Sequence, residues 1–444
     1  MIDLSPEVLT LLMLGGVLAG VMTGFPLALM IGGVGLIVGF LAFGPTVLDI
    51  LYHRVFSNVT NYTLLAVPLF VFMGIMLERS GVAEKLYDAL YLWLGGLRGG
   101  LAIATLLIGT VMAACVGIIG ASVTMLAIVA LPAMIKRGYD RGIATGAVCA
   151  GGTLGILIPP SIMLVVYGPM ALISVGKLFM AAFVPGFLLS GLYVLYVGIR
   201  CTLQPNLAPT VPLEERQVPF MQKTVKLVVS LLPPALLILA VLGVIFFGIA
   251  PPTEAAAVGA LVATILTAVY GRFSWRVLKE TAHETLKLSS AVLLIAAASF
   301  AFTGVFLNAG GGNVVKDMIM ATPGGAWGAF AVIMFVCFIL GMFIDWMGII
   351  FIIVPIVTPV APVLGFDPIW FAMMIIVNLQ MSFMTPPFAY AIFFTRAAAP
   401  PELNVTTADV IRGVIPFVIL IVVGLALCII FPQIITWLPS KMIA

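Results

Sequence analysis

Long apolar runs separated by short polar connectors follow one another along almost the whole chain. The first run extends from Val8 to Phe43 and is interrupted at Gly24-Phe25-Pro26, so it predicts two helices, because glycine and proline end helices. Other runs predict single membrane-crossing helices; they occupy residues 63–77, 178–199, 227–249, 255–270, 288–307 and 414–432. The pattern predicts an all-α protein that crosses a membrane many times.

Two stretches mix charged and large apolar side chains. Residues 78–96 interleave acidic and basic residues with leucines and Trp93, which predicts an amphipathic helix lying at the membrane surface. Residues 272–287 form a second mixed stretch, directly before an apolar run. We interpret the first as an interfacial helix and assign the basic residues of the second to a cytoplasmic connector.

Two of the longest apolar runs, residues 100–134 and 326–364, are interrupted in the middle. The first interruption spans Gly117 to Thr124, and the second spans Gly341 to Gly348. Each run is too long for one crossing, since about 20 helical residues span a bilayer. The connectors at its two ends must also lie on one side if basic residues are to face the cytoplasm. We therefore expect two re-entrant hairpins.

Two further runs, residues 143–170 and 368–394, predict helices that are broken near their centres. The first break follows a glycine-rich segment and ends at Pro159-Pro160, and the second ends at Pro386-Pro387. A break frees carbonyls that suit a cation and amides that suit an anion. The second break is richer in side-chain oxygens: Asn378, Gln380, Ser382 and Thr385. The alternative is a simple proline kink, which needs only one proline.

Composition supports a membrane protein. Of the 444 residues 63% are hydrophobic and 8% are charged, and mean hydropathy is +1.27, which is far too apolar for a soluble chain. The net charge of +3 comes without any basic run, so nucleic acid is excluded as a partner. Five scattered cysteines and two histidines in polar connectors, His53 and His283, form no metal cluster. The sequence predicts no cofactor.

The positive charges predict the orientation, because connectors on the cytoplasmic side are rich in Lys and Arg. With the amino terminus outside, sixteen of the 20 lysines and arginines fall on the cytoplasmic side. The four that fall outside are Arg54, Lys177, Lys316 and Lys441. This map predicts that both termini are periplasmic. The segment Met1 to Pro6 is short and acidic, so we expect no cleavable signal peptide.

The two halves of the chain repeat the same features in the same order. Gly138-Tyr139-Asp140 is echoed by Gly365-Phe366-Asp367, and both Pro-Pro steps are separated by 227 positions. The turn of the first half is flanked by Lys136, Arg137 and Arg141, whereas its counterpart has no basic residue. Equivalent turns on opposite faces predict an inverted repeat, with the site at its interface. Residues 1–200 would form the first repeat, 201–226 a cytoplasmic connector, and 227–444 the second repeat.

Two acidic residues stand out. Asp345 has no charged neighbour within twenty positions, and a carboxylate at membrane depth marks an ion or proton pathway by default. The alternative is a structural aspartate that caps the tip of the hairpin. Glu254 follows Pro251-Pro252 at a predicted helix start, where an acid caps free amides, so we favour a structural role there.

Together these segments resemble the large membrane subunit (the DctM-like M subunit) of TRAP transporters, the tripartite ATP-independent periplasmic transporters. The resemblance rests on Gly151–Ser161, on the tips at 120–124 and Asp345, and on Thr385-Pro386-Pro387, and it covers almost the whole chain. It implies a sodium-coupled elevator, in which a transport domain of hairpins and broken helices moves against a fixed scaffold.

The resemblance also implies where the ligands bind. A first sodium site would join hairpin tip and break through Gly117, Ser122, Thr124, Gly152, Thr153, Ile156 and Pro159. A second would join Gly341, Asp345, Met347, Ser382, Met384 and Thr385. The organic anion, usually a carboxylate, would lie between the tips near Ser122, Ser161, Asp345, Thr385 and Pro386.

The same resemblance implies the partners and the location. They are a small four-helix membrane subunit and a periplasmic substrate-binding protein, in the inner membrane of a bacterium, with Na⁺ as the coupling ion. We expect symport driven by the sodium gradient, because the chain has no phosphate-binding Gly-x-x-x-x-Gly-Lys-Ser/Thr motif. The substrate itself is left open, since in this family the binding protein selects it.

Three alternatives differ in class. A stand-alone sodium- or proton-coupled symporter for organic anions would need no binding protein. A channel would need a polar stripe along a membrane span, and the sequence has none. An intramembrane enzyme would need a Ser-His pair, paired aspartates or a metal cluster, and the predicted spans offer no such group, so the chain is not expected to be an enzyme.

Overall fold

The computed structural model describes residues 4–442, and every regular element in that range is helical. Both chain ends lie outside the described residues. The predictions about a signal peptide and about periplasmic termini concern these ends. The helices of the first half are α1 (Pro6–Met22), α2 (Leu27–Phe43), α3 (Val47–Val59), α4 (Ala66–Arg79), α5 (Val82–Leu94), α6 (Gly100–Val116), α7 (Ile119–Lys136), α8 (Arg141–Thr153), α9 (Ile162–Ala171) and α10 (Val175–Leu203).

The second half contains helices of similar kind in a similar order. They are α11 (Phe220–Ile238), α12 (Val244–Phe246), α13 (Pro252–Val269), α14 (Trp275–Asn308), α15 (Gly311–Met320), α16 (Gly325–Phe343), α17 (Trp346–Ile352), α18 (Val354–Val357), α19 (Val360–Val363), α20 (Pro368–Ser382), α21 (Tyr390–Ala398), α22 (Thr407–Ile430) and α23 (Gln433–Thr436). Short 3₁₀ turns occupy 44–46, 62–65, 154–156, 205–207, 213–216, 401–403 and 439–441, and a π-helical turn occupies 239–243. In the described part, nine helices are long and apolar enough to cross a membrane.

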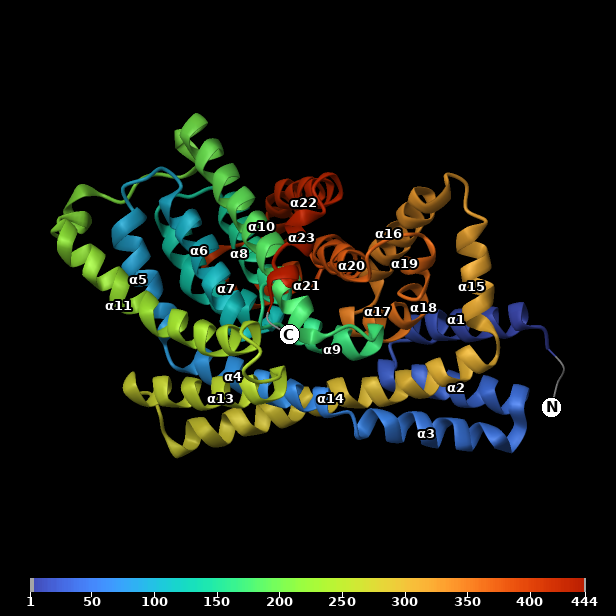
Figure 1. The fold of residues 1–444 in the computed structure, drawn as a ribbon. Coiled ribbons are helices and arrows are strands. Elements are labelled where there is room, and N and C mark those ends of the chain that lie inside the picture. Colours follow the sequence, from blue (N-terminus) through green and yellow to red (C-terminus); the bar gives the residue numbers. More distant parts are fainter. Residues whose placement is uncertain (1–3, 443–444) are drawn as a thin grey trace.

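The helices form two layers (Figure 1). We call the first the base layer: it consists of α2, α3, α4, α13 and α14, which pack along one another at the bottom of the view. The second, the hairpin layer, consists of α6–α10 and α16–α22, and it contains both predicted hairpins and both predicted broken helices. The two layers meet where α4 packs on α6 and where α14 packs on α17.

Both hairpins and both breaks form as the sequence predicts. Hairpin 1 consists of α6 and α7, and hairpin 2 consists of α16 followed by α17–α19. Break 1, residues 154–161, separates α8 from α9, and break 2, residues 383–389, separates α20 from α21. Each break contains a cis Pro-Pro bond. The fold is thus all-α with discontinuous helices, as expected.

Three local predictions differ from the structure. Residues 272–287 are not a connector separate from the span 288–307, because α14 continues unbroken from Trp275 to Asn308. Glu78 belongs to the membrane helix α4, and the amphipathic α5 begins only after the left-handed Gly81. The presumed connector containing His53 is helix α3, and His283 lies within α14. In each place the helix gains tertiary packing that a local hydropathy pattern does not register.

The half-helix that follows each break packs against the hairpin in the other half of the chain. Helix α9, which follows break 1, packs against α17 and α18 of hairpin 2. Helix α21, which follows break 2, packs against α7 of hairpin 1 and against α8. At that contact the Cys149 Sγ lies 3.0 Å from the Thr395 Oγ1. Because each break supports the opposite hairpin, the two tips lie on one packed unit.

Candidate functional site

The tip of hairpin 1 lies directly against break 1. Gly117 ends α6 with a left-handed backbone (φ 66°), which favours glycine, and a Cβ at this position would lie 2.8 Å from the Pro160 carbonyl oxygen. Val123 on the return helix packs equally closely on Gly152 of α8. The sequence-predicted first set is therefore brought together, with the tip residues on one side and the segment 152–160 on the other.

The hydroxyl groups around break 1 differ in their partners. Ser161 donates a hydrogen bond from Oγ to the Ile156 carbonyl at 2.6 Å, and Thr153 donates one to the Ala150 carbonyl at 3.1 Å. The Ser122 Oγ is buried and has no hydrogen-bond partner among the described residues. It faces Gly155, whose Cβ would lie 3.3 Å from it. A buried hydroxyl without a partner is costly, so this oxygen is suited to coordinate an ion.

The tip of hairpin 2 lies against break 2 in the same manner. A Cβ on Gly341 would lie 2.6 Å from both the Cβ and the Oγ of Ser382, so only glycine fits there. Ser382 donates from Oγ to the Phe338 carbonyl at 3.2 Å. The backbone amide of Phe388 donates to the Met342 carbonyl at 3.0 Å. Hairpin 2 and break 2 therefore form one unit held by backbone as well as side-chain contacts.

Asp345 stands at the turn of hairpin 2 and caps the next helix. Its Oδ1 accepts a hydrogen bond from the Trp346 amide at 2.8 Å, so Asp345 is the N-cap of α17. The structural alternative considered for this residue is thus realised. The side chain also lines a cavity, so capping leaves the carboxylate able to serve a second role.

That cavity, which we call the tip cavity, has a volume of about 510 Å³. It lies between the two hairpin tips, the start of α21, and the base-layer helices α4 and α14. Its lining residues are Ile75, Glu78, Ile118, Ile119, Gly120, Ala121, Thr124, Glu284, Lys287, Leu288, Asp345, Trp346, Tyr390 and Phe394. The two tips, more than 200 residues apart in sequence, face one space.

The predicted site residues divide into three groups around this cavity. Thr124 and Asp345 line it. Ser122, Ser161, Gly152, Thr153, Ile156 and Pro159 are buried behind the first tip, and Ser382 and Met384 are buried behind the second. Met347 and Thr385 are half-buried, and Pro386 is exposed. Thr385 donates from Oγ1 to the Met381 carbonyl at 2.9 Å. Of the five residues predicted to touch the anion, Asp345 is the one that borders the tip cavity.

Sequence reasoning missed the charged residues that the base layer contributes to the tip cavity. Glu78 comes from α4, and Glu284 and Lys287 come from α14. Glu284 pairs with Arg79 of α4 at 2.7 Å, and Arg79 also pairs with Glu280. The signal is present in the sequence, since these charges lie next to apolar runs, but the pattern predicts an interfacial helix for residues 78–96 and a connector for residues 272–287.

Other candidate chemistry is weaker. No group of three or more His, Cys, Asp or Glu side chains within residues 4–442 is placed to hold a metal ion. All five cysteines are buried. Glu254 is exposed in the first turn of α13, where an acid is favoured by the helix dipole.

The chain was compared with known proteins. The profile of the family described as "Tripartite ATP-independent periplasmic transporter, DctM component" matches residues 13–434. A C4-dicarboxylate TRAP transporter large permease protein from Pseudomonas aeruginosa is 33% identical over 90% of this chain and 91% of its own length. An ectoine TRAP transporter large permease protein from Halomonas elongata is 27% identical over 96% of this chain and 98% of its own length.

A solved structure shares the fold. The Alcanivorax borkumensis YdaH transporter, whose topology is described as unusual, superposes with a TM-score of 0.62 at 16% identity, covering 87% of this chain and 90% of the other. The relatives named above are permease subunits of transporters and not enzymes. With its hairpins, its breaks and a family profile that covers nearly its full length, this chain belongs to the DctM family of large membrane subunits of TRAP transporters.

Proposed function

We propose that this chain, together with a small membrane subunit, carries an organic carboxylate into the bacterial cell by sodium symport. A periplasmic binding protein would deliver the anion. The observation that carries the proposal is the tip cavity, where both hairpin tips and the Asp345 carboxylate meet. The relatives named for C4-dicarboxylate and ectoine support a small organic solute as the substrate.

Sodium would bind behind the tips, where oxygen atoms converge. At the first tip the unpaired Ser122 hydroxyl faces Gly155 of break 1, and Gly117 lies beside the Pro160 carbonyl. At the second tip Asp345 supplies the formal negative charge. A small hard cation favours such oxygen ligands. Once the sodium charge offsets that of Asp345, a carboxylate substrate can approach the tips without strong repulsion.

The two layers suggest how the site alternates between the two sides. The hairpin layer would move as one body along the base layer, in which α14 is the longest helix at 34 residues. Arg79, Arg272 and Arg276 lie at the end of the base layer that borders the tip cavity, so by the positive-inside rule this end would face the cytoplasm. The conformation described here would then be inward-facing. The two repeats would be related by inversion.

The test is uptake into proteoliposomes that contain the chain and its small membrane subunit. Succinate, N-acetylneuraminate and ectoine would be offered as radiolabelled probes, each with the binding protein encoded beside the chain. We expect accumulation only when the binding protein is present and sodium is higher outside. Asp345→Ala should abolish this uptake without preventing membrane insertion.

The matched control is Asp317→Asn, which removes an exposed carboxylate on α15. It should leave uptake within about twofold of the unmodified protein. Uptake without any binding protein would instead identify a stand-alone symporter. Flux that ignores the sodium gradient would identify a channel, and full uptake by Asp345→Ala would refute the role of this carboxylate.

A further inference from the structure

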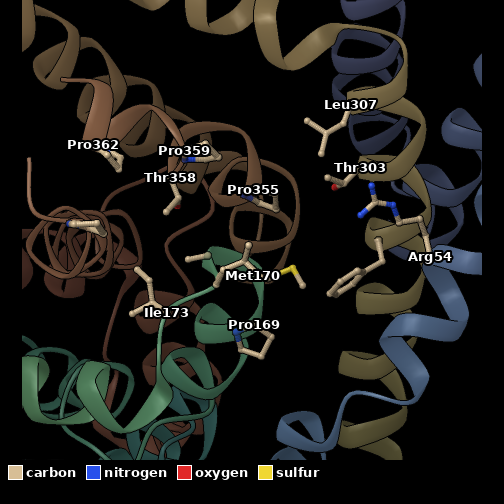
Figure 2. Close-up of a pocket in the computed structure, with 14 residues that line it drawn as sticks. Arg54, Pro169, Met170, Ile173, Thr303, Leu307, Pro355, Thr358, Pro359 and Pro362 are labelled. Atoms are coloured by element: carbon tan, nitrogen blue, oxygen red, sulfur yellow. The ribbon is translucent and has the colours of Figure 1, made fainter. Parts of the chain in front are cut away.

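A second cavity, of about 430 Å³, also lies between the hairpin layer and the base layer (Figure 2). We call it the Arg54 cavity. Its walls are the end of α9, the proline-rich α18 and α19 of hairpin 2, and the carboxyl-terminal part of α14. Arg54, Thr303 and Thr358 line it together with apolar side chains. Arg54 is the one charged side chain among them.

Arg54 is directed into the protein and not toward lipid. Helix α3 exposes an apolar stripe at Leu48, Tyr52 and Phe56. Arg54 is two positions from both Tyr52 and Phe56, so it lies on the opposite face of the helix. The Arg54 stem packs on Gly304 of α14, where a Cβ would lie 2.5 Å from the Arg54 Cγ. Figure 2 shows the guanidinium next to Thr303, pointing into the cavity.

The guanidinium has no anionic partner in the structure. A guanidinium carries five N–H donors. Within residues 4–442, Arg54 takes part in no ion pair and donates no side-chain hydrogen bond, although its side chain is half-buried. Across the cavity, the buried Thr358 hydroxyl also has no partner. A half-buried cation and an unpaired hydroxyl that border one space are suited to a small anion with several oxygens.

The two cavities border the same helix at different heights. The tip cavity touches α14 at residues 284–288, and the Arg54 cavity touches it at residues 300–307. Residues 288 and 300 are about 18 Å apart along a helix axis, at 1.5 Å per residue. The charges also differ, because the tip cavity contains Glu78, Glu284 and Asp345 together with Lys287. The Arg54 cavity is thus lined by one cation, whereas the tip cavity is lined by three carboxylates and one lysine.

We propose that Arg54 is an anion-binding residue of the base layer, which binds a carboxylate of the substrate when the site faces the Arg54 cavity. This inference rests on the proposed uptake of an organic carboxylate. The tip cavity, whose lining contains three carboxylates and one lysine, then favours release of the same anion. An anionic lipid headgroup could offer Arg54 similar oxygen atoms, so the experiment separates the two sources.

The first experiment measures the charge preference of the cavity without any substrate. Thr303→Cys places a thiol beside Arg54, and the five native cysteines are all buried and react slowly. In phosphatidylcholine nanodiscs, the thiol should react faster with anionic sulfonatoethyl methanethiosulfonate than with its cationic trimethylammonium analogue. Adding Arg54→Gln should lower that rate ratio at least about fivefold, as expected for the loss of one nearby charge. Adding Arg54→Lys should preserve most of it.

Three results of this experiment would overturn the proposal. One is a rate ratio that Arg54→Gln leaves unchanged. Another is a preference that disappears in phosphatidylglycerol nanodiscs, because the lipid would then be the anion. The third is a preference that disappears when the small membrane subunit is bound, because Arg54 would then pair with that subunit. Protection of the thiol by millimolar succinate, and not by chloride, supports the proposal.

The second experiment measures uptake with whichever of the three probes the unmodified protein transports. Arg54→Gln should raise the half-saturating concentration of the loaded binding protein at least about fivefold, with the maximal rate changed less. Arg54→Lys should recover part of the affinity. The matched control is Lys177→Gln, an exposed base that does not line the cavity. If Arg54→Gln transports the probe as well as the unmodified protein does, the inference about Arg54 is refuted and the proposed function is not. Unmodified protein that transports none of the probes refutes the proposed function, and the thiol rates still decide the inference.

Discussion

Asp345 has two roles that a single set of variants can separate. As the N-cap of α17 it accepts the Trp346 amide at 2.8 Å, and as a lining residue of the tip cavity it presents a negative charge. Asparagine and serine are good N-caps, whereas alanine is a poor one. Asp345→Asn and Asp345→Ser therefore keep the cap and remove the charge, and Asp345→Ala removes both.

The magnitudes follow from these two roles. Loss of an N-cap costs about 1 kcal/mol, so in sodium-free buffer Asp345→Ala should be less stable by that amount and Asp345→Asn should match the unmodified protein. Binding of sodium at a hundred times its dissociation constant stabilises the folded state by about 2.7 kcal/mol per site. If loss of the charge weakens sodium tenfold at the second site, that gain falls to about 1.4 kcal/mol.

The assay is thermal unfolding of the purified protein in sodium chloride and in choline chloride at equal ionic strength. The readout is the stabilisation that sodium adds, measured for each Asp345 variant and for the control Asp317→Asn. We expect Asp345→Asn to lose much of the sodium-dependent stabilisation while its sodium-free stability is unchanged. An Asp345→Asn protein that sodium stabilises fully would refute the reasoning, because Asp345 would then serve only as a cap.

Three further predictions concern the packing and charges around the site. Ser122→Ala should leave stability in sodium-free buffer unchanged, because the Ser122 hydroxyl has no partner, but it should reduce the stabilisation by sodium. Ser161→Ala should instead lower the stability by about 1 kcal/mol in both buffers, because the Ser161 hydroxyl is hydrogen-bonded. Gly341→Ala should destabilise the protein by about 1–3 kcal/mol through overpacking, read by thermal unfolding. Glu215 lies in the connector 201–226, and its carboxylate accepts hydrogen bonds from the Arg137 guanidinium after α7 and from the Tyr91 hydroxyl of α5. These two donors hold the pKa of Glu215 below the ordinary value of 4.5. Its contribution to stability is therefore complete above pH 4.5 and is lost as the pH falls through the lowered pKa, so unfolding of Glu215→Gln should lack that acid-dependent component.

Each of these has an outcome that would contradict it. Equal loss of sodium stabilisation in Ser122→Ala and Ser161→Ala would show that neither hydroxyl is specific for the ion. Unchanged stability of Gly341→Ala would mean that hairpin 2 does not press on break 2. Identical pH profiles for the unmodified protein and Glu215→Gln would mean that the exposed ion pair contributes nothing measurable to stability. Many surface ion pairs behave in this way.

Membrane helices, hairpins and breaks are determined by the sequence alone. Apolar runs fix where helices can form, since in hydrocarbon every backbone polar group must be bonded within the protein. Pro159-Pro160, Pro386-Pro387 and the interruption at Gly117 fix where those helices cannot continue. Asp345 stands out because a lone carboxylate within an apolar run has few structural reasons to exist there.

Only the tertiary structure decides what surrounds these features. The crossing of α9 and α21 onto the opposite hairpins joins two tips that are more than 200 residues apart in sequence. Local periodicity records which face of a helix is apolar, but not which helix will cover it. For the same reason Glu78, Glu284 and Arg54 were interpreted as parts of surface segments. Packing of α4, α14 and α3 in the base layer places all three on cavity walls, because tertiary contacts and not local periodicity decide which helix faces each side chain.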